Sequence, residues 1–379
     1  MSVADLALQR NKYKHLSDDE WRWFLQQVEG RERTAEKLPT FASIPEWWYP
    51  VRLSCEQCSS ELAARYKASL ISNFKFQVSN FVDLTGGYGV DTYFISEQFE
   101  HTDYVEQNAE LCRIASHNFS LPYKEGMGVG SIAIHNCTAE EFLSSLTGEV
   151  GRGYDLIFLD PARRDSHGGK VFRLEDCTPN VVELLPTLRQ HGKRLMIKLS
   201  PMLDLTQAVK ELSVFSTQWS VYVVAIKNEV KELLLLSGGS GQITAIDLDK
   251  KDQAFVFTRE EESNSPLAIN HSPFAFIYEP NAAILKAGAY KLVAERFGLH
   301  KLDVNTHLYC SEQLIENFPG RIWRITEKQD LKQANVLCRN YPLTPEQLKK
   351  KLHLKDGGTA FIIGCRVAGK PTLFYAERV

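Results

Sequence analysis

Between residues 81 and 236, short apolar runs alternate with segments whose apolar residues recur at helical spacing. The runs predict strands at 81–84, 103–105, 131–134, 154–159, 195–199, 221–226 and 231–236. The segments between them predict helices at 90–99, 109–119, 139–146, 179–189 and 204–212. This alternation predicts a parallel sheet with right-handed crossovers, which binds ligands at the carboxyl ends of its strands. The short link between the last two strands predicts one antiparallel strand at or near the edge.

The segments on either side of this pattern differ from it. Ser17 and Glu20 form a capping box that predicts a helix at about 17–28, residues 38–49 predict a loop, and residues 54–70 predict a second helix. After a Gly/Ser break at 238–241 we expect a β-hairpin at 243–248 and 254–258, and a polar linker at 260–266. The remainder predicts a smaller α+β unit, with helices at 282–297 and 345–352 and strands at 321–326, 335–339, 359–365 and 372–375.

Composition narrows the class of protein. The chain has 379 residues, 44% of them hydrophobic and 24% charged, which is typical of a soluble protein of two or three domains. No apolar run is long enough to span a bilayer, the first 15 residues are polar, and the eight cysteines are scattered, so we expect a cytoplasmic protein with no membrane contact.

Charge is unevenly distributed along the chain. Residues 281–379 carry 16 Lys and Arg against 9 Asp and Glu, although the whole chain has a net charge of -3. A basic final part on an acidic body fits a nucleic-acid-binding appendage, and an ordinary solvated surface is the equal alternative.

The turn after the first strand of the sheet is the strongest candidate for ligand binding. Gly86, Gly87 and Gly89 follow that strand and open a helix, so backbone can approach a ligand there. Glu106 comes 20 residues after Gly86, at the end of the second strand, where an acid can bind ribose hydroxyls. The order Gly-Gly-x-Gly departs from the dinucleotide pattern Gly-x-Gly-x-x-Gly. Asp83, just before the turn, suits a cofactor with a positively charged amino-acid end.

The fourth strand ends in Asp160-Pro161-Ala162-Arg163. A carboxylate and backbone carbonyls at a strand tip can polarise an amine or hydroxyl for nucleophilic attack. Basic residues follow in the same loop, at Arg163, Arg164, Lys170 and Arg173. They could grip phosphate, or pair with the acids of the same loop.

Taken together, these motifs resemble those of class I S-adenosylmethionine-dependent methyltransferases. The chain is more closely similar to a bacterial family that joins this domain to a ferredoxin-like segment and a C-terminal THUMP-like domain. The resemblance rests on residues 56–61, 66–67, 82–91, 160–164, 198–201 and 335–343. It implies a Rossmann-like α/β sheet at 76–272, after a helical region at 1–75 and before a ferredoxin-like segment at 273–320 and a THUMP-like domain at 321–379.

The resemblance also implies a cofactor site for S-adenosyl-L-methionine. The glycines and Asp83 are expected around its methionine part and Glu106 on its ribose. The usual acid after the third strand is absent, and Asn136 or Thr138 stands in its place. The full set assigned to the cofactor is Asp83, Thr85, Gly86, Gly87, Gly89, Asp91, Glu106, Asn136, Thr138 and Asp160.

The acceptor side departs from familiar patterns. Ala162 and Arg163 replace the second proline and the aromatic residue of many methyltransferases that act on exocyclic amines. Enzymes that methylate pyrimidine carbon need a thiolate, and Ser200 stands where those enzymes carry a cysteine.

A set of charged residues is similar to the Lys-Asp-Lys-Glu set of ribose 2'-O-methyltransferases. This set is Lys67, Asp160, Lys198 and Glu232, with Glu229 as a substitute for the last. Lys198 lies inside an apolar strand, where a lysine is costly unless it is paired. The alternative is a lysine at the strand end that reaches solvent. The candidate catalytic residues are therefore Asp160, Pro161, Arg163, Lys198, Lys67 and Glu232.

The sequence thus predicts a methyltransferase that acts on structured RNA, tRNA or rRNA, at a base nitrogen or a ribose hydroxyl, with the basic C-terminal unit delivering the RNA. Two alternatives stay open: a methyltransferase of a protein or small molecule, and an inactive RNA-binding assembly factor. Cys55 and Cys58 have the spacing of half a zinc site or a redox pair. Neither context is complete, so we expect no metal and interpret them as ordinary helical cysteines.

Overall fold

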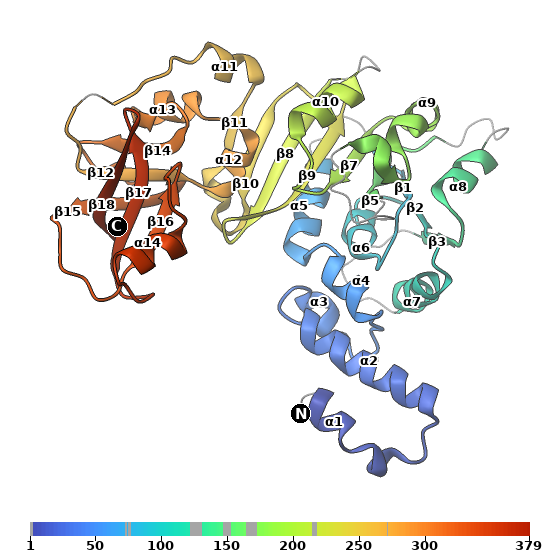
Figure 1. The fold of residues 1–379 in the computed structure, drawn as a ribbon. Coiled ribbons are helices and arrows are strands. Elements are labelled where there is room, and N and C mark those ends of the chain that lie inside the picture. Colours follow the sequence, from blue (N-terminus) through green and yellow to red (C-terminus); the bar gives the residue numbers. More distant parts are fainter. Residues whose placement is uncertain are drawn as a thin grey trace. The chain divides into compact units, whose positions relative to one another are not determined.

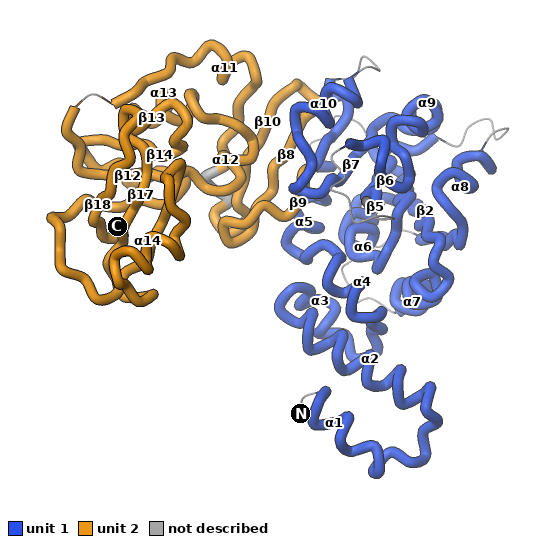
Figure 2. The backbone as a smooth tube through the Cα atoms, viewed as in Figure 1, with its two compact units in different colours: residues 1–219, 234–238 blue, residues 220–233, 239–379 orange. Residues whose placement is uncertain are grey.

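The computed structural model describes residues 3–72, 74, 77–121, 131–146, 153–163, 173–213, 218–270 and 272–379. The chain forms two compact units (Figure 2): unit 1 is 1–219 with 234–238, and unit 2 is 220–233 with 239–379. Within the described residues, no helix combines the length and the apolar character that crossing a membrane requires.

Unit 1 begins with helices that precede the sheet along the chain (Figure 1). They are α1 (Val3–Ala7), η1 (Arg10–Tyr13), α2 (Asp18–Thr34), α3 (Pro39–Ala42), α4 (Arg52–Gln57) and α5 (Glu61–Ile71). The predicted capping box of α2 is confirmed, because Ser17 accepts from the Glu20 amide and Glu20 accepts from the Ser17 amide. The predicted loop at 38–49 contains the short helix α3. The predicted single helix at 54–70 is wrong: Cys58 and Ser60 are extended, and Ser60 caps a new helix by accepting from the Ala63 amide at 3.3 Å.

The predicted parallel sheet is confirmed in unit 1. Its strand order is β7-β4-β1-β2-β3, and every neighbouring pair is parallel. The strands are β1 (Asn80–Asp83), β2 (His101–Val105), β3 (Ser131–His135), β4 (Leu156–Leu159) and β7 (Leu195–Leu199). The helices that alternate with them are α6 (Val90–Ser96), α7 (Ala109–Ser120), α8 (Ala139–Ser145), α9 (Val181–His191) and α10 (Leu205–Ser213). Phe81, Val82 and Leu156 are fully buried, so the strands form the core because they are apolar on both faces.

Short elements and one reversed strand complete this part of the chain. β5 (Ala162–Arg163) pairs with β6 (Cys177–Thr178), after the 3-10 turn η2 (Leu174–Asp176). β8 (Trp219–Ile226) and β9 (Glu229–Ser237) are joined by Lys227 and Asn228, whose φ angles of 53° and 61° form the tight hairpin turn that reverses a strand. β9 is not an edge strand, because its final residues lie beside β7, where the Leu195 amide donates to Ser237 Oγ at 2.8 Å.

Unit 2 continues from this hairpin. β10 (Ile243–Asp247) pairs with β8, and β11 (Phe255–Phe257) pairs antiparallel with β10 after the 3-10 segment η3 (Leu248–Gln253), which confirms the predicted hairpin strands. The predicted linker at 260–266 is wrong. It contains helix α11 (Arg259–Asn264), which forms because Thr258 and Glu261 make a capping box.

The rest of unit 2 is a second sheet with the order β13-β14-β12-β15-β18-β17-β16. Its strands are β12 (Phe276–Pro280), β13 (His300–Asp303), β14 (Thr306–Ser311), β15 (Gly320–Thr326), β16 (Asn335–Arg339), β17 (Ala360–Val367) and β18 (Lys370–Arg378). Trp323 and Ile363 belong to its buried core. Helix α14 (Pro345–Lys351) is as predicted. The predicted helix at 282–297 is two helices, α12 (Ala282–Ala287) and α13 (Lys291–Phe297), because Gly288 ends the first with a φ of 81°.

Candidate active site

A cavity of about 430 Å³ opens at the carboxyl ends of β1, β2, β4 and β7 in unit 1. Its size lies within the roughly 300–1,000 Å³ of small-ligand sites. Many of the predicted site residues line it: Asp83, Thr85, Gly86, Gly87, Gly89, Asp91, Glu106, Thr138, Asp160 and Lys198. Ser54, Gln57, Cys58 and Ser59 also line it. The break between α4 and α5 therefore forms one wall, which the sequence did not assign.

The glycine turn is shaped by tight packing. A Cβ on Gly86 would lie 2.2 Å from the Tyr104 ring, and one on Gly89 would lie 2.7 Å from the Phe119 ring. Gly87 and Gly89 also have left-handed φ angles of 56° and 83°. Larger residues are excluded at these positions, so the backbone itself forms the cavity wall.

Glu106 is held by the backbone on both sides of its carboxylate. Its Oε2 accepts from the Gly87 amide at 2.9 Å, and its Oε1 accepts from the Asn108 amide at 2.8 Å. These two bonds fix the carboxylate against the glycine turn at the cavity wall. Glu106 thus lines the cavity, and its role in binding ribose hydroxyls stays a prediction.

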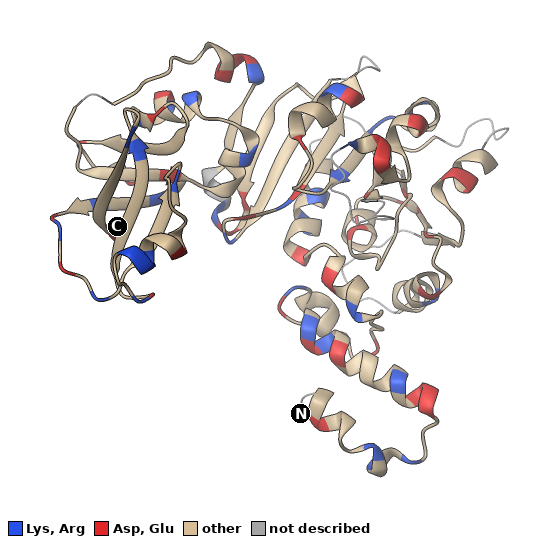
Figure 3. Cartoon of the chain, in the orientation of Figure 1, with Lys and Arg blue, Asp and Glu red and all other residues tan. Residues whose placement is uncertain are grey.

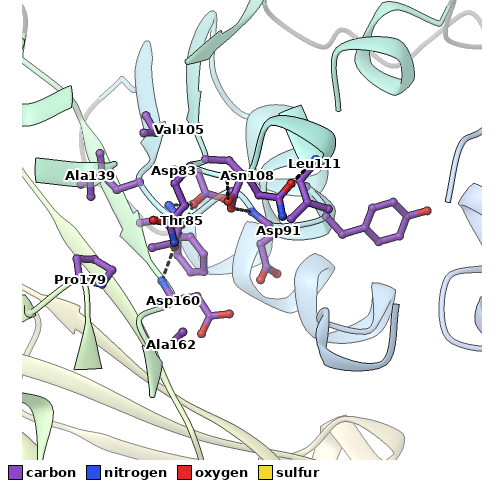
Figure 4. A pocket seen from close by; sticks show the side chains of 18 of the residues that line it. Asp83, Thr85, Asp91, Val105, Asn108, Leu111, Ala139, Asp160, Ala162 and Pro179 are labelled. Carbon is purple, nitrogen blue, oxygen red and sulfur yellow. Dashed lines mark hydrogen bonds between the residues drawn. The ribbon is translucent and has the colours of Figure 1, made fainter. Parts of the chain in front are cut away.

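Asp83 links the glycine turn to the tip of β4 (Figure 4). Its carboxylate accepts from the Thr85 amide at 2.9 Å and from Thr92 Oγ1 at 2.6 Å, and the Asp160 amide donates to Thr85 Oγ1 at 2.7 Å. Asp83 is 1% exposed. Burial raises its pKa to about 7, although the hydrogen bonds from Thr92 and Thr85 act in the opposite direction.

Two lysines and two aspartates meet around one hydroxyl, and with Ser59 we call them the lysine–aspartate cluster. Lys198 Nζ pairs with Asp160 Oδ2 and lies 3.6 Å from Asp91 Oδ2, and Lys67 Nζ lies 3.1 Å from Asp91 Oδ1. Ser59 Oγ lies within hydrogen-bond distance of Lys67, Lys198 and Asp91. Burial opposes ionisation of Asp91, but Lys67, Lys198 and Ser59 together hold its pKa below the ordinary value. Lys198 is therefore a paired lysine, not one that reaches solvent.

The two residues predicted to contact adenine have other partners. The Asn136 side chain donates to the carbonyls of Glu106 and Gln107, both at 3.0 Å, and does not line the cavity. Thr138 lines the cavity, but its hydroxyl accepts from the Glu141 amide and caps α8. Asn136 thus supports the loop after β2, and its direct contact with a cofactor stays a prediction without a geometric basis.

The remaining candidates lie around or beyond the cavity. Pro161 is buried and does not line it, whereas Ala162 does. The backbone of Arg163 pairs with Cys177, and its side chain, like residues 164–172, lies outside the described residues. Arg173 pairs with Glu175 at 2.8 Å, one of the acid partners foreseen for this loop. Glu232 is buried in β9 within unit 2, and its role stays a prediction.

Cys55 and Cys58 lie at the end of α4. Burial raises the pKa of Cys55 to about 12 and also raises that of Cys58. Their thiols donate to backbone carbonyls, Cys55 to Pro50 and Cys58 to Cys55. Because neutral thiols are poor nucleophiles and poor metal ligands, this pair favours a packing role.

Comparison with known proteins identifies the family. The chain is similar to the "putative methyltransferase from Porphyromonas gingivalis W83", with 31% identity, a TM-score of 0.83, and coverage of 96% of this chain and 92% of that one. The chain belongs to this methyltransferase family. Its residues 276–319 match a ferredoxin-like domain model, and residues 320–378 match a THUMP domain-like model.

Two relatives from Mycobacterium tuberculosis, of strains CDC 1551 / Oshkosh and ATCC 25618 / H37Rv, are described as uncharacterized S-adenosylmethionine-dependent methyltransferases. Each is 22% identical over 225 residues, which is 56% of this chain and 60% of the relative. The match therefore spans only part of each relative. The family's cofactor is S-adenosylmethionine, and the cavity fits it: Glu106 is oriented by backbone amides at the wall, and Gly86, Gly87 and Gly89 leave backbone accessible beside it.

Proposed function

We propose that this methyltransferase transfers a methyl group from S-adenosylmethionine to an oxygen or nitrogen of structured RNA. The observation that carries the proposal is the tip of β4. There the Asp160 amide donates to Thr85 Oγ1, on the cavity wall beside the glycine turn, while the Asp160 carboxylate is paired with Lys198. One residue thus connects the side that would hold the cofactor with the side that would meet the acceptor.

The cofactor supplies an electrophilic methyl group on its sulfonium. Asp160 has a side chain that is 38% exposed, so it can accept the proton that an acceptor O–H or N–H loses. Lys198 stabilises the carboxylate in the orientation that receives this proton. Cys58 and Cys137 also line the cavity, but burial raises the pKa of both thiols, which disfavours methylation of carbon through a thiolate.

RNA is the proposed substrate because of the C-terminal part of the chain. The match to a THUMP-like domain covers residues 320–378, and residues 281–379 carry an excess of Lys and Arg. The last turn of α14 contains Lys349, Lys350 and Lys351, the last two of which are exposed (blue in Figure 3). Exposed lysines of this kind contribute to phosphate binding.

The test uses total RNA from cells with and without the protein. The full chain and radiolabelled S-adenosylmethionine should methylate RNA from cells that lack the protein and should leave RNA from normal cells unlabelled. Mass spectrometry of the labelled nucleosides then names the atom. Label in protein or metabolite fractions alone would overturn the RNA assignment. Calorimetry that detects no cofactor binding would leave only a non-enzymatic role.

A further inference from the structure

Ser59 joins both lysines of the lysine–aspartate cluster through its hydroxyl. It lies in the break between α4 and α5, is 7% exposed and lines the cavity. We propose that Ser59 is a positioning residue of the methyl-transfer site, which holds Lys198 against Asp160. This inference rests on the proposed function, because it assigns Asp160 and Lys198 to the transfer step.

The hydrogen-bonding capacity of Ser59 is completely used. Ser59 Oγ lies 2.7 Å from Asp91 Oδ2, 3.3 Å from Lys67 Nζ and 3.1 Å from Lys198 Nζ. A hydroxyl has one hydrogen to donate and two lone pairs. Because an ammonium only donates and an ionised carboxylate only accepts, the hydrogen must point to Asp91 and the lone pairs must face the lysines. The polarity of the cluster is therefore fixed by the types of its groups.

Ser59 decides how Lys198 is shared between two carboxylates. The Lys198 ammonium is paired with Asp160 and lies 3.6 Å from Asp91 Oδ2. Asp91 is occupied on one oxygen by Lys67 and on the other by the Ser59 hydroxyl. Without that hydroxyl, Asp91 Oδ2 loses its hydrogen bond and can accept one from Lys198, whose Nζ lies 3.6 Å away. The lysine would then move from Asp160 toward Asp91, away from the tip of β4.

The neighbouring Ser60 provides a matched control. Its hydroxyl lies in the same break and caps α5 through the Ala63 amide. Ser60→Ala therefore weakens the same helix junction without removing a partner of either lysine. Ser59→Thr keeps the hydroxyl, and Ser59→Cys keeps the volume while replacing the hydroxyl with a weak donor and acceptor.

The experiment measures single-turnover methyl transfer to RNA from cells that lack the protein, together with calorimetric S-adenosylmethionine binding. Ser59→Ala should lose roughly 10- to 100-fold in rate, as expected when buried charged groups lose a partner, with cofactor affinity unchanged. Ser59→Thr should recover most of the rate.

Several results would overturn the assignment. A Ser59→Ala rate equal to that of the wild type, an equal loss in Ser60→Ala, or a parallel loss of cofactor binding would each do so. If Ser59→Ala does not fold, Ser59→Cys replaces it and full activity of that variant has the same consequence. A wild-type protein that methylates no RNA overturns the proposed function first, and the role of Ser59 in transfer with it.

Discussion

Asp83 makes the stability of unit 1 depend on pH in the direction opposite to most carboxylates. The substitution Asp83→Asn replaces it with a neutral side chain of the same shape. An asparagine oxygen can still accept from the Thr85 amide, and its NH₂ can donate to Thr92 Oγ1. The variant therefore mimics the protonated acid at every pH.

The magnitude follows from the folded pKa of about 7 against an ordinary value of 3.8. Since one pKa unit corresponds to 1.36 kcal/mol, ionising Asp83 in the folded protein costs about 4 kcal/mol relative to the unfolded chain. Because the folded pKa is the higher one, this stability is present below about pH 4 and is lost as the pH rises through about 7. Between about pH 5 and about pH 8, the wild type should lose about 2.5 kcal/mol that Asp83→Asn keeps.

Scanning calorimetry measures this difference. The unfolding transition whose melting temperature rises when S-adenosylhomocysteine is added belongs to unit 1. For this transition, the melting temperature of Asp83→Asn relative to that of the wild type should increase by roughly 5–10 °C when the pH is raised from about 5 to about 8. Asp155→Asn is the control. Lys193 and the amides of Ser79 and Asn80 outweigh burial and lower the pKa of Asp155, so its contribution is lost only in acid. A difference between Asp83→Asn and wild type that stays constant with pH would refute the reasoning.

Three further outcomes are expected. Lys198→Ala should abolish methyl transfer while calorimetry still detects S-adenosylmethionine binding, because Lys198 is paired with Asp160, the proposed proton acceptor. Glu106→Gln should weaken cofactor binding by roughly tenfold, since a charged acceptor is lost, whereas Asn136→Ala should change it less in the same titration. Charge reversal at Lys350 and Lys351 should weaken RNA binding in gel shifts and make it less dependent on salt concentration. Replacing both lysines by uncharged glutamine, Lys350→Gln and Lys351→Gln, should have a smaller effect.

The sheet and the glycine turn could be predicted because their signals are local. Apolar runs mark strands that are buried on both faces, and a turn with left-handed residues such as Gly87 and Gly89 requires glycine. The position of Glu106 at the cavity wall could be predicted for the same reason, because its distance along the chain from the turn is set by one helix and one strand. Predictions failed where a short polar stretch decides between helix and loop. Ser60 caps α5 after a break that the predicted helix at 54–70 missed, and Thr258 caps α11, which the predicted linker at 260–266 missed.

Ser59 could not be found from the sequence because its partners are distant along the chain. It bonds to Lys198, which is 139 residues away, and to Asp91, which is 32 residues away. Ser59 follows the two cysteines and precedes a helix, so it has no periodic signal, and the packing of α5 against α6 brings it to Asp91. Asn136 is the converse case: its position after the third strand suits a ligand, but its amide donates to the backbone carbonyls of Glu106 and Gln107, and its contact with the cofactor stays a prediction.

The exposure of the four charged groups separates their roles. The side chains of Lys67, Asp91 and Lys198 are 0%, 10% and 12% exposed, whereas that of Asp160 is 38% exposed. Two ammonium and two carboxylate groups cancel in charge, and a buried set of this kind costs least when it stays neutral. A proton that reaches Asp160 from an acceptor leaves the set with an excess positive charge. In the proposed transfer, Asp160 is the member from which solvent can remove that proton, because its side chain is the most exposed of the four.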